Sequence, residues 1–357
     1  MSRLSGQNLP NAPVASIDVQ AIQHNLNLAR ACAPASKVLA MVKANAYGHG
    51  VAGLAGRLQG IDGYGVARVE EGLQLRALGV TKPIVVLQGF IDGAELDACV
   101  AAELTPALHS DYQLRLLESR NAATLPVWLK VDTGMHRLGF APPTLPALLA
   151  NGRLNVACIV THLANAGEPQ HDQNQRQLDS FLQLTANTHL PRSMANSGAI
   201  LALPMSHFEW IRPGIMLYGS SPGDQPDPNL RSAMTLTAPI IAVKSLVAGQ
   251  AIGYGGSWTA PGPTRVAIVG IGYADGYPRE IPAQMPVWVA GRRCPIVGRV
   301  SMDSIMVELG QLDVEPPARV ELWGKNLPVD EVAQLLGSIG YTLMSRLTSR
   351  VQREYLH

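Results

Sequence analysis

The sequence predicts an α/β protein in which a (βα)₈ barrel of the TIM type is followed by a mainly β C-terminal domain. Short apolar runs alternate with amphipathic segments up to about residue 232. Helical periodicity then nearly disappears until about residue 327. Turns rich in Gly and Pro separate short β-like runs in that later part.

The apolar runs of the first part are interpreted as parallel strands, because strands that alternate with helices form βα units. They are Lys37–Val42, Tyr64–Arg68, Ile84–Gln88, Thr105–His109, Val127–Asp132, Val156–His162, Arg192–Asn196 and Phe208–Tyr218. Helices are expected at Val69–Leu78, Ala94–Glu103, Asp111–Asn121 and Gln173–Thr188. An open doubly wound sheet is the alternative, but no run is followed by its GxGxxG fingerprint.

The second part is predicted to be a β domain with one late helix. Its expected strands are Thr235–Ser245, Arg265–Gly270, Pro286–Ala290, Cys294–Val300, Ile305–Leu309 and Arg319–Trp323. A helix at Val329–Leu336 precedes a C-terminal strand. We therefore expect a barrel domain at residues 1–232, with residues 1–14 as a flexible lead-in, and a second domain at residues 233–357.

Composition excludes several functional classes. Hydrophobic residues make up 47% of the 357 residues and the net charge is +1, which is typical of a globular protein. A near-neutral chain has no electrostatic attraction for nucleic acid or an anionic membrane. No apolar run approaches the roughly 20 residues of a membrane helix, and no signal-like stretch opens the chain, so a cytoplasmic location is expected. Because no CxxC pair occurs, we expect four free thiols rather than two disulfides, and no metal site, from Cys32, Cys99, Cys158 and Cys294.

Candidate functional residues follow the predicted barrel strands, because barrel active sites lie at the carboxyl ends of the strands. These residues are Lys43 and Tyr47, Arg137, His162, Asn196 and Ser197, with Arg212, Gly214 and Ile215 inside the eighth run. Loops after the seventh and eighth strands often bind phosphate, and here they offer a hydroxyl and glycine-adjacent amides. A phosphate cradle with a lysine that can form a Schiff base outlines a pyridoxal 5′-phosphate (PLP) site.

Eight motifs in order give the sequence a family resemblance. They are VKANAYGHG, KVDTGMHRLGF, THLANA, SMANSGA, IRPGIMLYG, IGYGGSW, GIGYADGYPR and GRVSMDSIMVELG. From about Ala15 to Val351 the chain resembles alanine racemase, a PLP-dependent homodimer with a barrel and a β domain. The resemblance implies interconversion of L-alanine and D-alanine, with each active site shared between two subunits.

The resemblance also implies roles for three residues that carry the chemistry. Lys43 resembles the lysine that binds PLP covalently and then acts as a base at the substrate Cα. Tyr254 resembles the second base, which the partner subunit supplies on the opposite face. Arg212 resembles the partner of the pyridine nitrogen. An arginine there cannot accept a proton, so the carbanion stays poorly delocalised, which suits racemisation.

Further residues are carried over to the cofactor and the substrate. His162 is expected beside the cofactor ring, and Arg137 at the PLP phenolic oxygen and the substrate carboxylate. Lys130 matches a lysine that is often carbamylated, and Tyr273 with Tyr341 is expected to narrow the entrance. The Met302 amide is expected to bind substrate from the partner, next to Asp303. The expected cofactor-binding positions also include Tyr47, Asn196, Ser197, Gly214, Ile215 and Tyr341.

The sequence departs from the family pattern at three positions, where Ser301, Thr342 and Gln352 replace the usual Cys, Glu and Pro. Leu138 fits an enzyme specific for alanine rather than a broad-specificity relative. A PLP decarboxylase of basic amino acids is one alternative, but it needs an acidic partner for the pyridine nitrogen and a cysteine near the site. A single-barrel PLP carrier is another, but it would lack the second domain.

Overall fold

The computed structural model describes residues 12–150, 152 and 154–356. Most of the predicted lead-in, residues 1–11, lies outside the described residues. The chain divides into two compact units, Ile22–Arg231 and Met1–Ala21 together with Ser232–His357. All four cysteines are free, as predicted.

The unit formed by Ile22–Arg231 is a closed barrel of parallel strands. In order around the barrel they are β2 (Lys37–Met41), β3 (Gly63–Val66), β4 (Ile84–Val86), β5 (Thr105–Leu108), β6 (Val127–Lys130), β7 (Val156–Val160), β8 (Arg192–Ser193) and β9 (Trp210–Ile211). Strand β9 closes the barrel by pairing with β2, where Trp210 lies opposite Lys37. The predicted barrel is therefore confirmed, and the open sheet is excluded.

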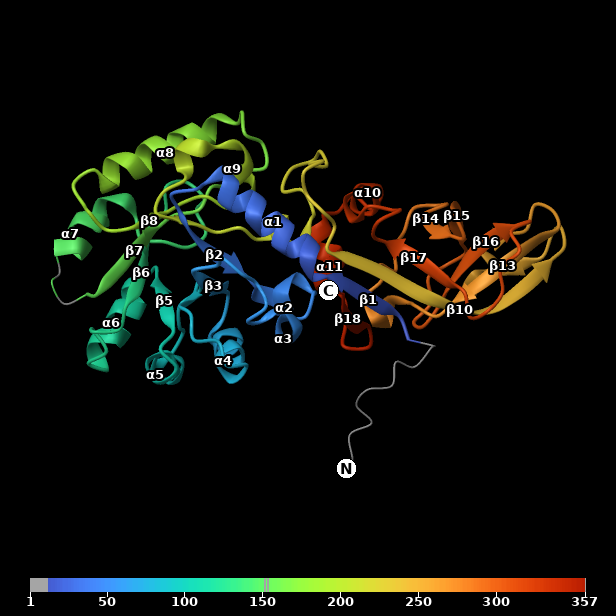
Figure 1. Cartoon of the computed structure of the whole chain (residues 1–357), viewed down its shortest axis with the longest axis horizontal. Helices are drawn as coiled ribbons and strands as arrows, with labels where there is room; N and C mark the ends of the chain where they lie inside the picture. Colours follow the sequence, from blue (N-terminus) through green and yellow to red (C-terminus); the bar gives the residue numbers. More distant parts are fainter. Residues whose placement is uncertain (1–11, 151, 153, 357) are drawn as a thin grey trace, which may run out of the picture. The chain divides into compact units, whose positions relative to one another are not determined.

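Helices cover the outside of the barrel. In Figure 1, α4 (Val69–Ala77), α5 (Gly93–Ala101) and α6 (Asp111–Ser119) lie on one side of the strands and α8 (Asp172–Thr185) on the opposite side. These four helices confirm the predicted ones. The prediction omitted α1 (Val19–Cys32), α7 (Leu145–Ala150) and α9 (Ser197–Ala202). In α1, Ile22, Leu26 and Ala29 recur at i, i+4 and i+7 and are fully buried, so the helical signal was present.

The other unit contains an eight-stranded sheet in the order β13-β16-β15-β14-β17-β10-β1-β18, in which β10 also pairs with β13. The predicted strands appear as β10 (Met234–Leu246), β13 (Thr264–Val269), β14 (Pro286–Val289), β15 (Arg292–Val297), β16 (Ile305–Gly310), β17 (Arg319–Trp323) and β18 (Gln352–Leu356). The helix α10 (Val329–Leu335) matches the predicted one, and α11 (Gly340–Ser345) is an additional helix.

The strand β1 (Val14–Asp18) belongs to this sheet and not to the barrel. It pairs antiparallel with β10 and parallel with β18. The predicted division placed these residues in the barrel domain, at the edge of the flexible lead-in. Val14, Ala15 and Ile17 are instead buried. The alternation that marks a half-buried strand is short here, which explains why the sequence did not reveal it.

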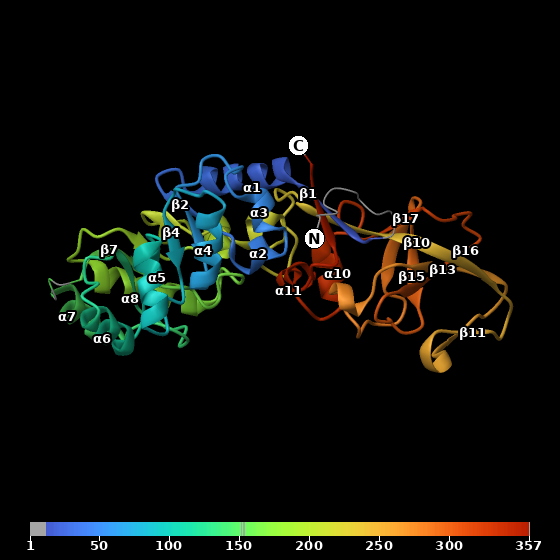
Figure 2. The ribbon, with the colours of Figure 1, turned by 90° about the horizontal axis from the view of Figure 1, so that it is seen from below.

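A small hairpin, β11 (Ala251–Ile252) and β12 (Trp258–Thr259), extends from the long sheet of the same unit. Figure 2 shows the β11 segment projecting away from β10, β13 and β16. The turn between its strands is the short helix η4 (Tyr254–Gly256). This turn carries the tyrosine that sequence analysis singled out.

Candidate active site

A cavity of about 220 Å³ lies at the carboxyl ends of the barrel strands. It is lined by Lys43, Lys130, Arg137, His162 and Arg212, together with Ala67, Leu87, Gln88, Leu138, Val160 and Thr161. The barrel therefore gathers five predicted site residues from loops far apart in the sequence. Four of them are lysines or arginines, so the cavity favours an anionic ligand.

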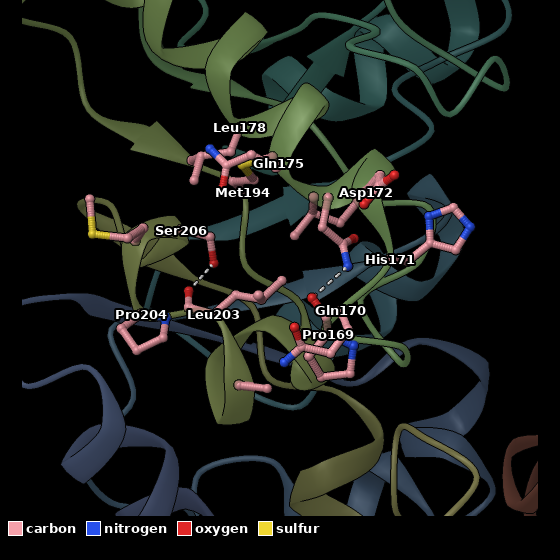
Figure 3. Close-up of a pocket in the computed structure, with 14 residues that line it drawn as sticks. Pro169, Gln170, His171, Asp172, Gln175, Leu178, Met194, Leu203, Pro204 and Ser206 are labelled. Atoms are coloured by element: carbon pink, nitrogen blue, oxygen red, sulfur yellow. Dashed lines mark hydrogen bonds between the residues drawn. The ribbon is translucent and has the colours of Figure 1, made fainter.

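A larger cavity of about 280 Å³ lies between α8 and the segment that follows α9. Figure 3 shows Leu178 and Met194 on one side of it and Leu203 and Pro204 on the other. No lysine or arginine is among the described residues that line it, so it offers no amine for covalent chemistry. The smaller, basic cavity is the better candidate for an active site.

Lys43 stands at the end of β2, at the start of α2 (Lys43–Tyr47). The next four residues, Ala44 to Tyr47, all have φ between 51° and 55° and form a left-handed helical turn. Such a conformation costs L-residues about 1–2 kcal/mol each, so the surroundings must stabilise the turn.

Several contacts stabilise the left-handed turn. Within it, the Ala46 amide donates to the Val42 carbonyl at 2.8 Å. The Asn45 side chain accepts from the Val51 amide at 2.8 Å. The Tyr47 ring stacks on Tyr218, with centroids 4.9 Å apart. The turn is therefore held at both ends, and the Lys43 amine lies 6.0 Å from the centre of the Tyr47 ring.

Arg212 follows β9 and is only 3% exposed. Its guanidinium donates to the Ser193 hydroxyl at 2.6 Å, to the Thr161 carbonyl at 2.8 Å and to the Met194 carbonyl at 3.1 Å. Burial lowers its pKa to about 10. The planar fork is held rigidly by these acceptors, as an arginine allows and a lysine does not.

The same guanidinium contacts His162, whose Nδ1 lies 3.1 Å from Arg212 Nη2. A guanidinium can only donate, so Nδ1 accepts and the proton of the neutral imidazole sits on Nε2. Burial holds the pKa of His162 well below its usual range, and the charge of Arg212 adds to this effect. His162 is therefore a neutral group at neutral pH.

Both lysines of the cavity have a lowered pKa. Burial lowers the pKa of Lys43, with Arg137 adding to the effect and Glu71 opposing it. Burial and then Arg212 lower the pKa of Lys130 to about 8. Both amines thus have an accessible neutral form, which nucleophilic chemistry requires.

A second cluster adjoins the cavity through the segment after Arg212. The Ser197 hydroxyl accepts from the Gly214 amide at 2.9 Å and from the Met216 amide at 3.3 Å. A Cβ at Gly214 would lie 2.5 Å from the Tyr47 hydroxyl oxygen, so a larger residue there would have to displace Tyr47. Asn196 caps α9 by accepting from the Ala199 amide. Ile215 is fully buried beside them.

The remaining predicted residues belong to the other compact unit. Tyr254 is 72% exposed, Met302 is 52% exposed and Tyr273 is 37% exposed. Tyr273 and Met302 lie on adjoining loops, because the Tyr273 amide donates to the Ser301 carbonyl and the Ala274 amide to the Met302 carbonyl. Burial raises the pKa of Tyr341, on α11, to about 12.

Sequence reasoning missed the residues that support the site. Glu71 accepts a hydrogen bond from the Ala44 amide, although nothing in VEEGLQ marks it as more than a surface glutamate. Ser193 and the carbonyl groups of Thr161 and Met194 hold Arg212. Backbone acceptors leave no side-chain signal, so only the folded structure could reveal them.

The comparisons with known proteins agree with this geometry. Residues 17–222 match the model of the N-terminal domain of alanine racemase, and residues 233–355 match that of its C-terminal domain. The chain belongs to the alanine racemase family. Alanine racemase from Yersinia pestis is 46% identical over 97% of this chain and 99% of its own length. A biosynthetic alanine racemase from Salmonella typhimurium is 46% identical over 95% of this chain and 98% of its own length.

Solved structures of the family give the same result. Biosynthetic alanine racemase from Pseudomonas aeruginosa superposes with a TM-score of 0.92 at 42% identity, over 97% of this chain and all of that one. The alanine racemase from Bartonella henselae, which holds covalently bound pyridoxal phosphate, has a TM-score of 0.90 at 33% identity, over 97% and 99% of the two chains. Both domains match racemases, so the chain is an amino-acid racemase. The decarboxylase and the single-barrel carrier are excluded as interpretations.

No helix in the described part of the chain is long and apolar enough to cross a membrane.

Proposed function

We propose that this chain interconverts L-alanine and D-alanine with PLP, using Lys43 on one face of the substrate and Tyr254 of the partner subunit on the other. The observation that carries the proposal is the basic cavity at the barrel mouth, where a lysine with a lowered pKa lies near two arginines. This donor set suits PLP, which carries an aldehyde, a phosphate and a phenolate.

The residues that would hold the cofactor fall into two groups. Lys43 would bind it covalently, with Arg212 and His162 beside its ring and Arg137 at its phenolic oxygen and the substrate carboxylate. The Tyr47, Asn196, Ser197, Gly214 and Ile215 cluster, with Tyr341, would hold its phosphate. When bound, PLP supplies the electron-withdrawing ring that acidifies the Cα–H bond of the amino acid.

Arg212 would determine which reaction follows. Because it donates every hydrogen bond that it makes, it cannot deliver a proton to a ring nitrogen and take it back. A carboxylate in its place would stabilise a long-lived carbanion. With Arg212 in this position, rapid return of the proton to Cα would be favoured, and racemisation would be favoured over transamination.

Two bases on opposite faces of the substrate would exchange the Cα proton. The lowered pKa of Lys43 makes its amine available as one base. Tyr254 is 72% exposed in the single chain, and in a dimer the positive charge of Arg212, beside His162 in the cavity, would favour the phenolate form that acts as a base. The Met302 amide, Tyr273 and Tyr341 would complete the substrate entrance in the homodimer.

Lys130 would act on Arg137 rather than on the substrate. With its pKa lowered to about 8, a fraction of its amine is neutral at pH 7 and can react with CO₂. The resulting carbamate would replace a repelling cation by an anion that orients Arg137. A ¹³C NMR spectrum in labelled bicarbonate should show a carbamate signal that disappears in Lys130→Met.

Chiral analysis of L-alanine incubated with the purified protein and PLP tests the proposed activity. We expect D-alanine to accumulate toward an equal mixture. Lys43→Ala and Tyr254→Phe should each lower kcat by about 10²-fold or more, because each removes one proton carrier. In D₂O, each variant should stop exchanging the Cα proton of one enantiomer of alanine with deuterium. The enantiomer affected should differ between the two variants. A protein that binds PLP but forms no D-alanine would contradict the proposed function.

A further inference from the structure

The Glu71 carboxylate joins two strand ends at the barrel mouth. It lies in the first turn of α4, and its Oε2 accepts from the Ala67 amide at 2.7 Å and the Arg68 amide at 3.1 Å. These two bonds cap its own helix. Its Oε1 accepts a third bond, at 2.6 Å, from the Ala44 amide. That third bond reaches the loop after a different strand and has no role in capping α4.

Ala44 directly follows Lys43 and opens the left-handed turn. The first amides of a helical turn have no acceptor within it, so an outside acceptor fixes their direction. The peptide bond is planar, so the direction of the Ala44 amide also fixes the Lys43 carbonyl. The bond to Glu71 therefore constrains the backbone from which the Lys43 side chain leaves.

Glu71 also supplies charge of the opposite sign to that of the cavity. The groups that face the Lys43 amine from the other strand ends are Lys130, Arg137, His162 and Arg212. Burial, Arg137 and Arg212 lower the pKa of Lys43, whereas Glu71 raises it. Glu71 thus limits how far burial and the neighbouring cations lower the pKa of the Lys43 amine.

We propose that Glu71 is a positioning residue for Lys43. The carboxylate of Glu71 holds the peptide after Lys43, and its negative charge balances the positive charge around the Lys43 amine. The proposal rests on the proposed function of Lys43. It predicts that loss of the Glu71 charge changes the titration of Lys43 and not only the stability of α4. A residue that merely caps α4 would change stability alone.

The first experiment measures Lys43 in the protein without PLP. Brief acetic anhydride pulses at a series of pH values, followed by mass spectrometry of the Lys43 peptide, give the midpoint of its reactivity. We expect Glu71→Gln to shift that midpoint to lower pH by about half a unit or more, because the charge that favours the cation is lost. Glu70→Gln is the matched control, since Glu70 lies exposed in the same first turn of α4.

The second experiment uses the PLP-loaded enzyme. Glu71→Gln should lower kcat about 10- to 100-fold, as expected when a reacting group is misplaced by up to about 1 Å. Glu71→Asp keeps the charge but shortens the reach, so its labelling midpoint should return toward the wild-type value while kcat recovers only in part. Glu70→Gln should racemise alanine at the wild-type rate.

Two results would overturn the proposal. One is a Glu71→Gln enzyme whose kcat and labelling midpoint both equal those of Glu70→Gln. The other is a lower unfolding midpoint in urea without any change in Lys43 labelling, which would leave only a capping role. If the wild-type chain does not racemise alanine, the proposed function fails, but the labelling of the PLP-free protein still decides the role of Glu71.

Discussion

At the scale of single residues, the barrel mouth concentrates positive charge, and Arg212 holds its part of that charge away from water. Arg212 keeps its charge because four acceptors surround it. Lys130 has an amine that can lose its proton, and its pKa falls to about 8. The difference follows from chemistry, since a guanidinium delocalises its charge and a primary amine does not. The lysines therefore respond to pH, while the arginine provides a fixed field.

Lys130 should make the stability of the protein depend on pH in the alkaline range. Its pKa is about 8 in the folded chain against 10.5 for an ordinary lysine, so the unfolded state binds more protons between these values. The free energy of unfolding should therefore rise with pH across this window, by about 2 kcal/mol after allowance for partial solvent screening. Urea unfolding of Lys130→Met in bicarbonate-free buffer should show a flatter profile. The exposed Lys325→Met serves as the control and should keep the wild-type slope.

At the scale of elements, the left-handed turn of α2 determines where Lys43 points. Ala44, Asn45, Ala46 and Tyr47 all have positive φ, although glycine is the residue that favours it. The turn persists because tertiary contacts offset the strain, including the ring of Tyr218 and the carboxylate of Glu71. Strain of this kind is found where a functional group has to be held in one direction.

Glycine at Ala44 should therefore stabilise the chain, which is the reverse of its effect in an ordinary helix. Ala44 is exposed with φ of 51°, so Ala44→Gly should gain about 0.5–1 kcal/mol in unfolding free energy by relieving the strain. Ala44→Val should lose about as much or more, because a β-branched residue tolerates this region poorly. Urea unfolding measures both. Ala98→Gly, within α5, should instead destabilise by about 1 kcal/mol. If both glycine substitutions changed the unfolding free energy in the same direction, the proposed role of strain at Ala44 would be contradicted.

The sequence predicted the elements with strong periodicity and missed those set by tertiary contacts. The strands β2 to β7 and the helix α8 carry apolar patterns that are legible without a structure. The left-handed turn carries none, because the run KANAY contains ordinary helix formers. Five of the predicted site residues line one cavity, and most of these could be proposed because Lys, Arg and His side chains after strand ends are informative, whereas Tyr254 and Met302 were proposed from the family resemblance alone. Glu71 and the carbonyl groups around Arg212 were missed because backbone hydrogen bonds do not depend on a recognisable residue type.

At the scale of the whole molecule, the proposed second base lies on an exposed segment of the chain. Tyr254 lies in the hairpin turn that projects from the sheet of its own unit (Figure 2), and it is 72% exposed. The proposed role of Tyr254 needs positive charge nearby, because a cation favours the phenolate form that acts as a base. A second copy that covers the hairpin would supply it, and a two-fold dimer would do so at two equivalent sites.

Mixing two inactive variants distinguishes a shared site from a site within one chain. If Lys43 works with Tyr254 of the partner subunit, a mixed dimer of Lys43→Ala and Tyr254→Phe contains one site with both native residues. Random exchange in an equal mixture makes half of the dimers mixed, so about one quarter of the wild-type activity should return. If both residues came from the same chain, every site in every dimer would lack one base, and no activity would return. Unfolding and refolding the variants together, with each variant refolded alone as control, makes the measurement. Because the recovered activity depends only on which chain supplies each residue, it tests the shared site independently of how strongly the dimer associates.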